Sequence, residues 1–246
     1  MSRKYKEPPI VEAVCEFRFQ PSSPWDITIP GLVFEKIQKD FPNREPVKQF
    51  EIGFSSTEEG VQQQVITADR IRFLSQDRKS MVQVGPDLLA VNRLKPYVSW
   101  QAFEPMIKQG FNAYLESAKP KGIQRIGLRY INRIEIPGER IKLEDYFEFY
   151  PYIGEKLPQE VGPFIVGIQI GYEQLRDMLK VLLVSVETSP PQKIGVSLDL
   201  DYFLLKPGSV PLTEVFNWIK LAHDNVEEVF EACIKEKLRQ MFQEVS

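Results

Sequence analysis

Three arginines within one apolar stretch are the strongest candidates for binding chemistry in this sequence. The segment "GIQRIGLRYINRIEI", residues 122–136, has the pattern of a buried strand, yet Arg125, Arg129 and Arg133 recur in it at every fourth position. Because side chains alternate across a strand, all three point to one face, opposite the apolar residues. Such a row can bind a phosphate, a carboxylate or a nucleic-acid backbone, and we include Tyr130 in this candidate site.

The same arginines also have a structural interpretation. The earlier stretch "EAVCEFRF" can be laid on "RIGLRYIN", which sets Glu12 and Glu16 at the positions of Arg125 and Arg129. If the two equivalent strands run antiparallel side by side, opposite charges face each other. Such pairs stabilise a sheet by ~0.2–1 kcal/mol each and penalise a shifted register. We therefore favour charge pairing between these four residues and keep ligand binding as the alternative.

Few other residues could carry catalysis. His223 is the single histidine, so a site with two histidine ligands is impossible, and a Ser-His-Asp or Cys-His site would have to use this residue. It borders the apolar stripe of a helix, where a histidine is typically a boundary residue. Asp199 and Asp201 share a strand face about 6–7 Å apart, but alternation on a solvated strand gives the same pattern. We expect no metal and no cofactor.

Composition excludes several classes of protein. The chain has 246 residues, of which 43% are hydrophobic and 26% charged, and its net charge is −3 at pH 7. These values are typical of a globular protein that is not drawn as a whole to nucleic acid or an anionic membrane. Cys15 and Cys233 lie far apart in apolar contexts, without disulfide or metal spacing. We find neither a secretory signal nor an apolar run of the ~20 residues that span a bilayer. We expect a cytoplasmic protein.

The elements that must position these residues occur twice. In residues 1–119, a strand and a short helix precede three extended stretches and a long helix: 10–19, 31–41, 47–54, 61–75, 81–94 and 99–118. In residues 120–246, the same order recurs: 123–136, 142–147, 163–175, 179–189, 193–205 and 212–242. Both halves therefore predict β-α-β-β-β-α, which indicates an internal duplication, as two domains or as one continuous domain.

The faces of the predicted strands indicate an α+β architecture. Val166, Ile168 and Ile170 share one apolar face, while Asp199 and Asp201 lie on a polar one. Burial of one face only is typical of antiparallel sheets that are covered by helices on one side. We predict a curved antiparallel sheet with long helices on one face. The element order resembles the TATA-binding-protein-like and helix-grip arrangements, and this likeness implies a fold without a function.

The last predicted helix extends beyond its counterpart in the first half. Its final turns carry four apolar residues, Ile234, Leu238, Met241 and Phe242. At helical spacing these side chains form a stripe that covers either a core or a second protomer. We regard them as a candidate interface.

Three stretches resemble the opening, middle and closing motifs of a bacterial family: "KEPPIVEAVCEFRF", "RIGLRYINRI" and "AHDNVEEVFEACI". The family contains functionally uncharacterised proteins of about this length that are sporadically distributed among genomes. The resemblance spans essentially the whole chain and implies one architecture, with no catalytic residue to carry over. Sporadic distribution is typical of mobile, toxin–antitoxin or defence-associated genes, which favours an interaction protein.

Three functional hypotheses follow from the sequence. We favour an interaction module that binds a protein partner or forms a homodimer, and we do not expect it to enter a membrane. The alternative is a binder of an anionic small molecule or nucleic acid, centred on Arg125, Arg129, Arg133 and Tyr130. The third is an enzyme that combines His223 with carboxylates of the sheet.

Overall fold

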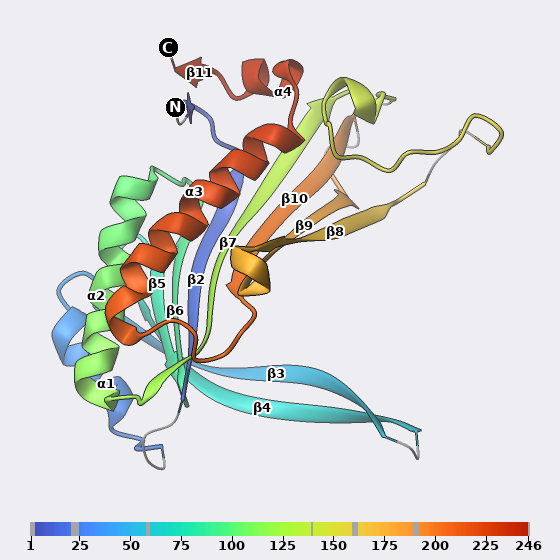
Figure 1. The fold of residues 1–246 in the computed structure, drawn as a ribbon. Helices are drawn as coiled ribbons and strands as arrows, with labels where there is room; N and C mark the ends of the chain where they lie inside the picture. The colour runs from blue at the N-terminus through green and yellow to red at the C-terminus, as the bar shows by residue number, and fades with distance from the viewer. Residues whose placement is uncertain are drawn as a thin grey trace. The chain divides into compact units, whose positions relative to one another are not determined.

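A computed structural model describes residues 3–20, 25–57, 60–138, 140–158, 162–188 and 192–245, and it describes the backbone alone for residues 48–69. The described residues form an antiparallel sheet of nine strands that does not close, with helices on one of its sides (Figure 1). The predicted α+β class is therefore confirmed. None of the helices in the described ranges is both long and apolar enough to cross a membrane.

The sheet comprises β2 (Ile10–Gln20), β3 (Asn43–Thr57), β4 (Gly60–Leu74), β5 (Ser80–Gly85), β6 (Leu88–Leu94), β7 (Gly122–Pro137), β8 (Ile165–Tyr172), β9 (Asp177–Val186) and β10 (Lys193–Leu204). A separate pair is formed by β1 (Lys4–Tyr5) and β11 (Glu244–Val245). The α-helices are α1 (Ile29–Ile37), α2 (Trp100–Ala118), α3 (Val215–Cys233) and α4 (Glu236–Met241). Three short 3-10 helices are η1 (Leu143–Asp145), η2 (Glu173–Leu175) and η3 (Leu212–Glu214).

The order of the strands follows one rule in both halves of the sequence. The order is β3-β4-β5-β6-β2-β7-β10-β9-β8. Outward from β2 come β6, β5 and β4, and outward from β7 come β10, β9 and β8. The first strand of each half thus lies at the centre of the sheet. The strand next to it on the outer side is the last strand of that half. This order agrees with the predicted duplication, and β2 and β7 are neighbours, as predicted.

The first half has one strand more than we predicted. The stretch 81–94, predicted as one extended segment, folds back as the hairpin β5–β6. Its turn contains Pro86, which fixes the backbone, and Asp87, whose φ of 50° lies in the left-handed region that aspartate tolerates in turns. When the strands of the two halves are matched in order from the centre of the sheet outwards, β3 has no counterpart among the described strands of the second half.

The chain divides into two compact units, which do not coincide with the predicted halves. Unit 1 comprises Met1–Val14, Leu94–Tyr97 and Arg125–Ser246, and unit 2 comprises Cys15–Arg93 and Val98–Gln124. The predicted boundary between residues 119 and 120 remains a prediction about the duplication.

An aromatic core holds unit 2 together. Phe17 of β2 packs against Phe111 of α2 with 5.0 Å between ring centroids, and Phe19 stacks on Tyr114 at 4.5 Å. Helix α2 begins after its N-cap Ser99, whose side chain accepts a hydrogen bond from the backbone of the first turn. Helix α1 lies beside α2, and its Phe34 and Phe73 of β4 contact each other. Two helices therefore cover this part of the sheet.

In unit 1, α3 is the one long helix that the described residues place on the sheet, and it contacts β10 (Figure 1). Its buried side chains include Ile219, Ala222 and Val226, and Leu198 and Leu200 of β10 are fully buried. The predicted continuous helix over 212–242 is wrong, because the chain becomes extended at Ile234 before α4 begins. This break directs the last turns back onto the core.

The four residues of the candidate interface follow this break. Ile234, Leu238 and Phe242 are 1%, 0% and 6% exposed, and Met241 is half-buried. Two roles were considered for this stripe, and the structure shows that Ile234, Leu238 and Phe242 cover a core. They are not available on the surface for a second protomer.

Candidate functional site

Each arginine of the row on β7 lies beside an acidic side chain. Arg129 Nε donates to Asp199 Oδ1 at 2.8 Å, and its Nη2 binds the other carboxylate oxygen. Arg125 forms a longer ion pair with Asp201, at 3.4 Å. Both acids belong to β10, which pairs with β7. Acidic and basic side chains on this face are thus arranged as pairs, of which the Arg129 pair is bidentate.

The third arginine has partners at the end of the row. Arg133 Nε lies 3.3 Å from a carboxylate oxygen of Glu135, two residues further along β7, and Arg133 also donates to the backbone oxygen of Glu187. The side chains of all three arginines are partly exposed, so these pairs contribute little to stability. Their main effect is to neutralise the row, which weakens the case for an anion site.

The charge around Arg129 also bears on the predicted pairing with β2. The hydrogen bond that Arg129 donates to Asp199 raises the pKa of Arg129, burial opposes this, and the negative charges of Asp199, Asp201 and Glu12 raise it further. Glu12 therefore belongs to the surroundings of Arg129, and a direct pair between the two remains a prediction. Glu16 accepts a hydrogen bond from Arg18 of its own strand at 2.9 Å. The pairing of Glu16 with the arginine row remains a prediction.

Tyr130 does not lie with the arginines. It is 5% exposed on the opposite face of β7, where its hydroxyl is 3.2 Å from His223 Nδ1 and 3.4 Å from the hydroxyl of Tyr97. Burial raises the pKa of Tyr97 to about 12, so this hydroxyl keeps its proton at neutral pH. Including Tyr130 in the arginine site was therefore wrong. Its neighbour Asn132 has a buried Oδ1 without a hydrogen-bond partner among the described residues.

The geometry also separates the groups of the enzyme hypothesis. His223 faces Tyr130, on the side of β7 that α3 covers, whereas Asp199 and Asp201 bind arginines on the other face. Strand alternation keeps these two sets apart. The described residues contain no group of three or more His, Cys, Asp or Glu side chains that could hold a metal ion.

A buried carboxylate that the sequence did not single out lies at the start of β9. Asp177 is fully buried and accepts hydrogen bonds from Trp218 Nε1 at 2.9 Å and from the Tyr202 hydroxyl at 3.1 Å. Arg176 completes its surroundings with an ion pair at 2.6 Å. Because both carboxylate oxygens have donors, Asp177 fastens α3 to β9 and β10 and has no open position for a substrate. In sequence it resembled any charged residue that begins a strand.

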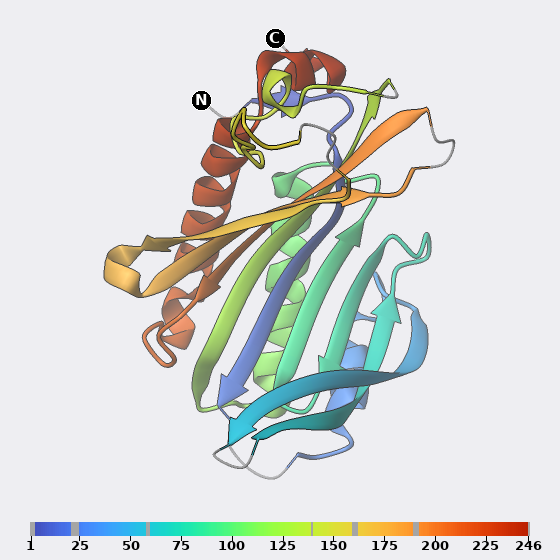
Figure 2. The ribbon, with the colours of Figure 1, turned by 90° about the vertical axis from the view of Figure 1, so that its right-hand side faces the viewer.

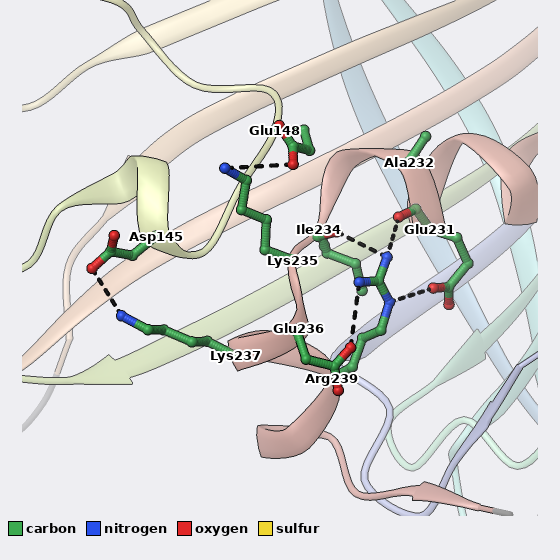
Figure 3. Close-up of a pocket in the computed structure, with 9 residues that line it drawn as sticks. All are labelled: Asp145, Glu148, Glu231, Ala232, Ile234, Lys235, Glu236, Lys237 and Arg239. Atoms are coloured by element: carbon green, nitrogen blue, oxygen red, sulfur yellow. Dashed lines mark hydrogen bonds and ion pairs between the residues drawn. The ribbon is translucent and has the colours of Figure 1, made fainter.

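A shallow hollow of about 540 Å³ lies where α3 gives way to α4 (Figure 3). Its charged lining is internally paired: Lys237 with Asp145 at 2.8 Å, and Lys235 with Glu148 at 3.4 Å. Arg239 binds the Glu231 carboxylate at 3.1 Å and donates to the backbone oxygens of Glu231 and Ile234. Arg239 therefore caps the carboxyl end of α3. The hollow is a structural junction without a cation free for a ligand among its lining residues.

The edge strand β8 is the remaining candidate, and here a prediction fails. Val166, Ile168 and Ile170 were expected in the core, yet Ile168 is 46% exposed and the other two are half-buried. In the first half, α1 lies beside α2 and contacts β4. Between β7 and β8 the described residues form no helix other than η1. The face of β8 that carries Val166, Ile168 and Ile170 therefore has no comparable cover. On the other face, Ile165 is 75% exposed.

The outer backbone groups of β8 are also available. The strand pairs with β9 in a hairpin closed by η2 (Figure 2), and it ends the strand order. Ser185 N donates to the oxygen of Phe164, which fixes the alternation of the ladder. Accordingly, the peptide groups of Ile165, Gly167, Gln169 and Gly171 point away from β9. Among the described residues no further strand pairs with them.

No protein-family model matches the chain, and neither does any curated protein. The choice between the candidate surfaces therefore rests on their geometry.

Proposed function

We propose that this protein is an interaction module that binds a polypeptide partner by accepting an extended strand along β8. The observation that carries this proposal is an apolar, uncharged edge strand, "IVGIQIGY", with Ile165 75% and Ile168 46% exposed. The face of this strand towards α3 is apolar throughout, and its other face carries Ile165, two glycines and the uncharged Gln169, a pattern closer to that of a sheet interior than of an exposed edge. Its place at an edge is consistent with a neighbour supplied by another chain.

The opposite edge of the sheet supports this interpretation by contrast. Proteins protect exposed edges with charged residues, with proline or with bulges, because unpaired peptide groups recruit other strands. Strand β3 begins "NREPV" and so carries Arg44, Glu45 and Pro46. Strand β8 carries none of these devices. In strand addition, backbone hydrogen bonds supply affinity and alternate side chains supply specificity.

The other candidate surfaces are less suited to binding a ligand. The arginines of β7 are neutralised by neighbouring acids, and the hollow beside α4 is lined by paired charges. Both cysteines are buried free thiols. Free thiols are the usual state in a reducing compartment, which supports a cytoplasmic location for this function.

A selection of displayed random peptides on the purified protein tests the proposal. The decisive variant is Gln169→Pro, because it removes an N–H that points away from β9 and leaves the β8–β9 ladder complete. Gln169→Thr keeps that N–H and is the matched control. We expect peptides of alternating apolar pattern that bind the wild type and Gln169→Thr, with at least ~10-fold weaker binding to Gln169→Pro.

The proposal fails if no selected peptide distinguishes the two variants. Peptides with apolar residues at helical spacing that bind Gln169→Pro as well as the wild type would also overturn it. That result would indicate a helix lying on the uncovered face of β8 in place of a strand along its edge.

A further inference from the structure

We infer that the strand accepted by β8 is β8 of a second copy of this chain, the two strands running antiparallel about a twofold axis at Ile168. This inference rests on the proposed function and names its partner. The two sheets would then continue into each other across the axis. Three properties of β8 support it: the direction of its peptide groups, the pattern of its side chains and its lack of charge.

The direction of the peptide groups restricts the register. The groups of Ile165, Gly167, Gln169 and Gly171 point outward, so these residues must bond to one another across the axis. With the axis at Ile168, Ile165 bonds to Gly171 of the second copy, and Gly167 bonds to Gln169. Ile168 then faces its own copy as a non-hydrogen-bonded pair, in which side chains approach most closely.

The side chains are compatible with this register on both faces. On the face towards α3, Val166 would lie opposite Ile170, and Ile168 opposite Ile168, so every pair is apolar. These are the side chains that the chain's own helices leave partly exposed. Pairing about the axis supplies each of them with an apolar neighbour.

On the other face, the larger side chains would lie opposite glycines. Ile165 meets Gly171, where the Leu175 side chain fills the space that a Cβ on the glycine would take. Leu175 is itself 57% exposed. The pair therefore brings two exposed apolar side chains, Ile165 of one copy and Leu175 of the other, next to each other.

The lack of charge suits a twofold partner in particular. A twofold axis brings each residue near its own kind, so any charge close to the axis repels its copy. Residues 161–172, "VGPFIVGIQIGY", contain no charged side chain. Edge pairing of one short strand buries an area at the low end for specific interfaces, below ~1,200 Å², so we expect a dimer that dissociates in the micromolar range.

A cysteine at the axis tests the register directly. In a non-hydrogen-bonded pair the two Cα atoms lie ~4.5 Å apart, within the range of a disulfide. Ile168→Cys should therefore cross-link to its own copy under mild oxidation. Val166→Cys is the matched control, since its copy would lie ~13 Å away along the strands. The natural cysteines add little background, because Cys15 and Cys233 are 0% and 6% exposed.

We expect Ile168→Cys to form a disulfide-linked dimer at least ~10-fold faster than Val166→Cys, and light scattering to show a wild-type dimer that dissociates on dilution. Gln169→Pro should be monomeric at the same concentrations. Equal cross-linking of the two cysteine variants, or a wild type that is monomeric throughout, would overturn the inference. If the displayed peptides still distinguish Gln169→Pro in that case, the proposed function stands with another partner. If they do not, both proposals fail.

Discussion

At the scale of single residues, the groups with the most reactive chemistry are occupied by structural contacts. Arg129 is held by Asp199, and both oxygens of Asp177 accept hydrogen bonds. The two thiols are buried, and burial raises the pKa of Cys15 and of Cys233. A nucleophilic thiolate requires the opposite shift. The residue scale therefore gives no support to an enzyme and points to packing as the role of these groups.

The buried thiols should make the protein less stable in alkali. Burial raises the pKa of Cys233 from 9.0 to about 11, so between these values the unfolded chain loses this proton first and stability falls as pH rises. Replacement by alanine removes the titrating group. We expect the unfolding free energy of Cys233→Ala, measured with urea at several alkaline pH values, to fall less steeply than that of the wild type.

A second substitution separates titration from packing in this experiment. Cys233→Ser fills a volume closer to that of cysteine and does not ionise in this range. Both variants should share the shallower slope, whatever their stability at neutral pH. A slope equal to the wild-type value in both would show that Cys233 does not contribute to the alkaline loss.

At the scale of elements, one carboxylate fastens α3 to the strands beneath it. Asp177→Ala would leave the Trp218 N–H and the Tyr202 hydroxyl without their acceptor and Arg176 without its counter-ion. A buried donor left without its acceptor costs about 1–3 kcal/mol, whereas Arg176 is partly exposed and can be solvated. We expect a loss of that size in the unfolding free energy from urea titration, with a smaller loss for Asp177→Asn, which keeps one acceptor oxygen.

Asp145→Ala is the control for the substitution of Asp177. It also removes an acidic partner, that of Lys237, but at an exposed position within η1. Exposed pairs contribute little, so no measurable change is expected. Similar losses for Asp177→Ala and Asp145→Ala would contradict the assignment of Asp177 as the anchor of α3.

The elements also show what the sequence can and cannot predict. Alternation located β7 and helical spacing located α2, because each depends on local pattern. The break at Ile234 was missed, since its cause is tertiary: Ile234 pairs with Phe147, and Arg239 caps the end of α3. The exposure of Ile168 was missed for a related reason. The apolar pattern specifies a face to be covered, and it does not specify whether a helix is there to cover it.

For the candidate site, the sequence identified the arginines of β7, and it did not predict that Asp199 and Asp201 pair with them. Asp199 and Asp201 were assigned to one strand face. Their place beside the arginines follows from the pairing of β7 with β10, in which Asp201 lies opposite Arg129. Tyr130 was drawn into the site by proximity along the chain, although alternation sends it to the opposite face. The edge position of β8 follows from strand order, which a single sequence does not reveal.

At the scale of the whole molecule, the two halves of the predicted duplication differ in their outermost strands. The first half adds β3, whose charges and Pro46 protect its edge, and it places α1 beside α2. Among its described residues, the second half has no counterpart of β3, and its outermost strand is β8. If a second copy of the chain supplies the missing neighbour, β8 of that copy takes the place that β3 holds in the first half. The duplication thus specifies which position is vacant.

A dimer of this kind links stability to concentration. A partner that binds only the folded chain raises stability by mass action, so the melting temperature of the wild type should rise as the protein concentration increases. The rise should begin near the dissociation constant, in the micromolar range expected for so small an interface. Gln169→Pro should melt at one temperature over the same range, because its edge cannot accept the second strand. Gln169→Thr should behave like the wild type. Thermal unfolding of all three proteins over a ~100-fold range of concentration measures this, and a wild-type melting temperature that stays constant would contradict dimerisation through β8.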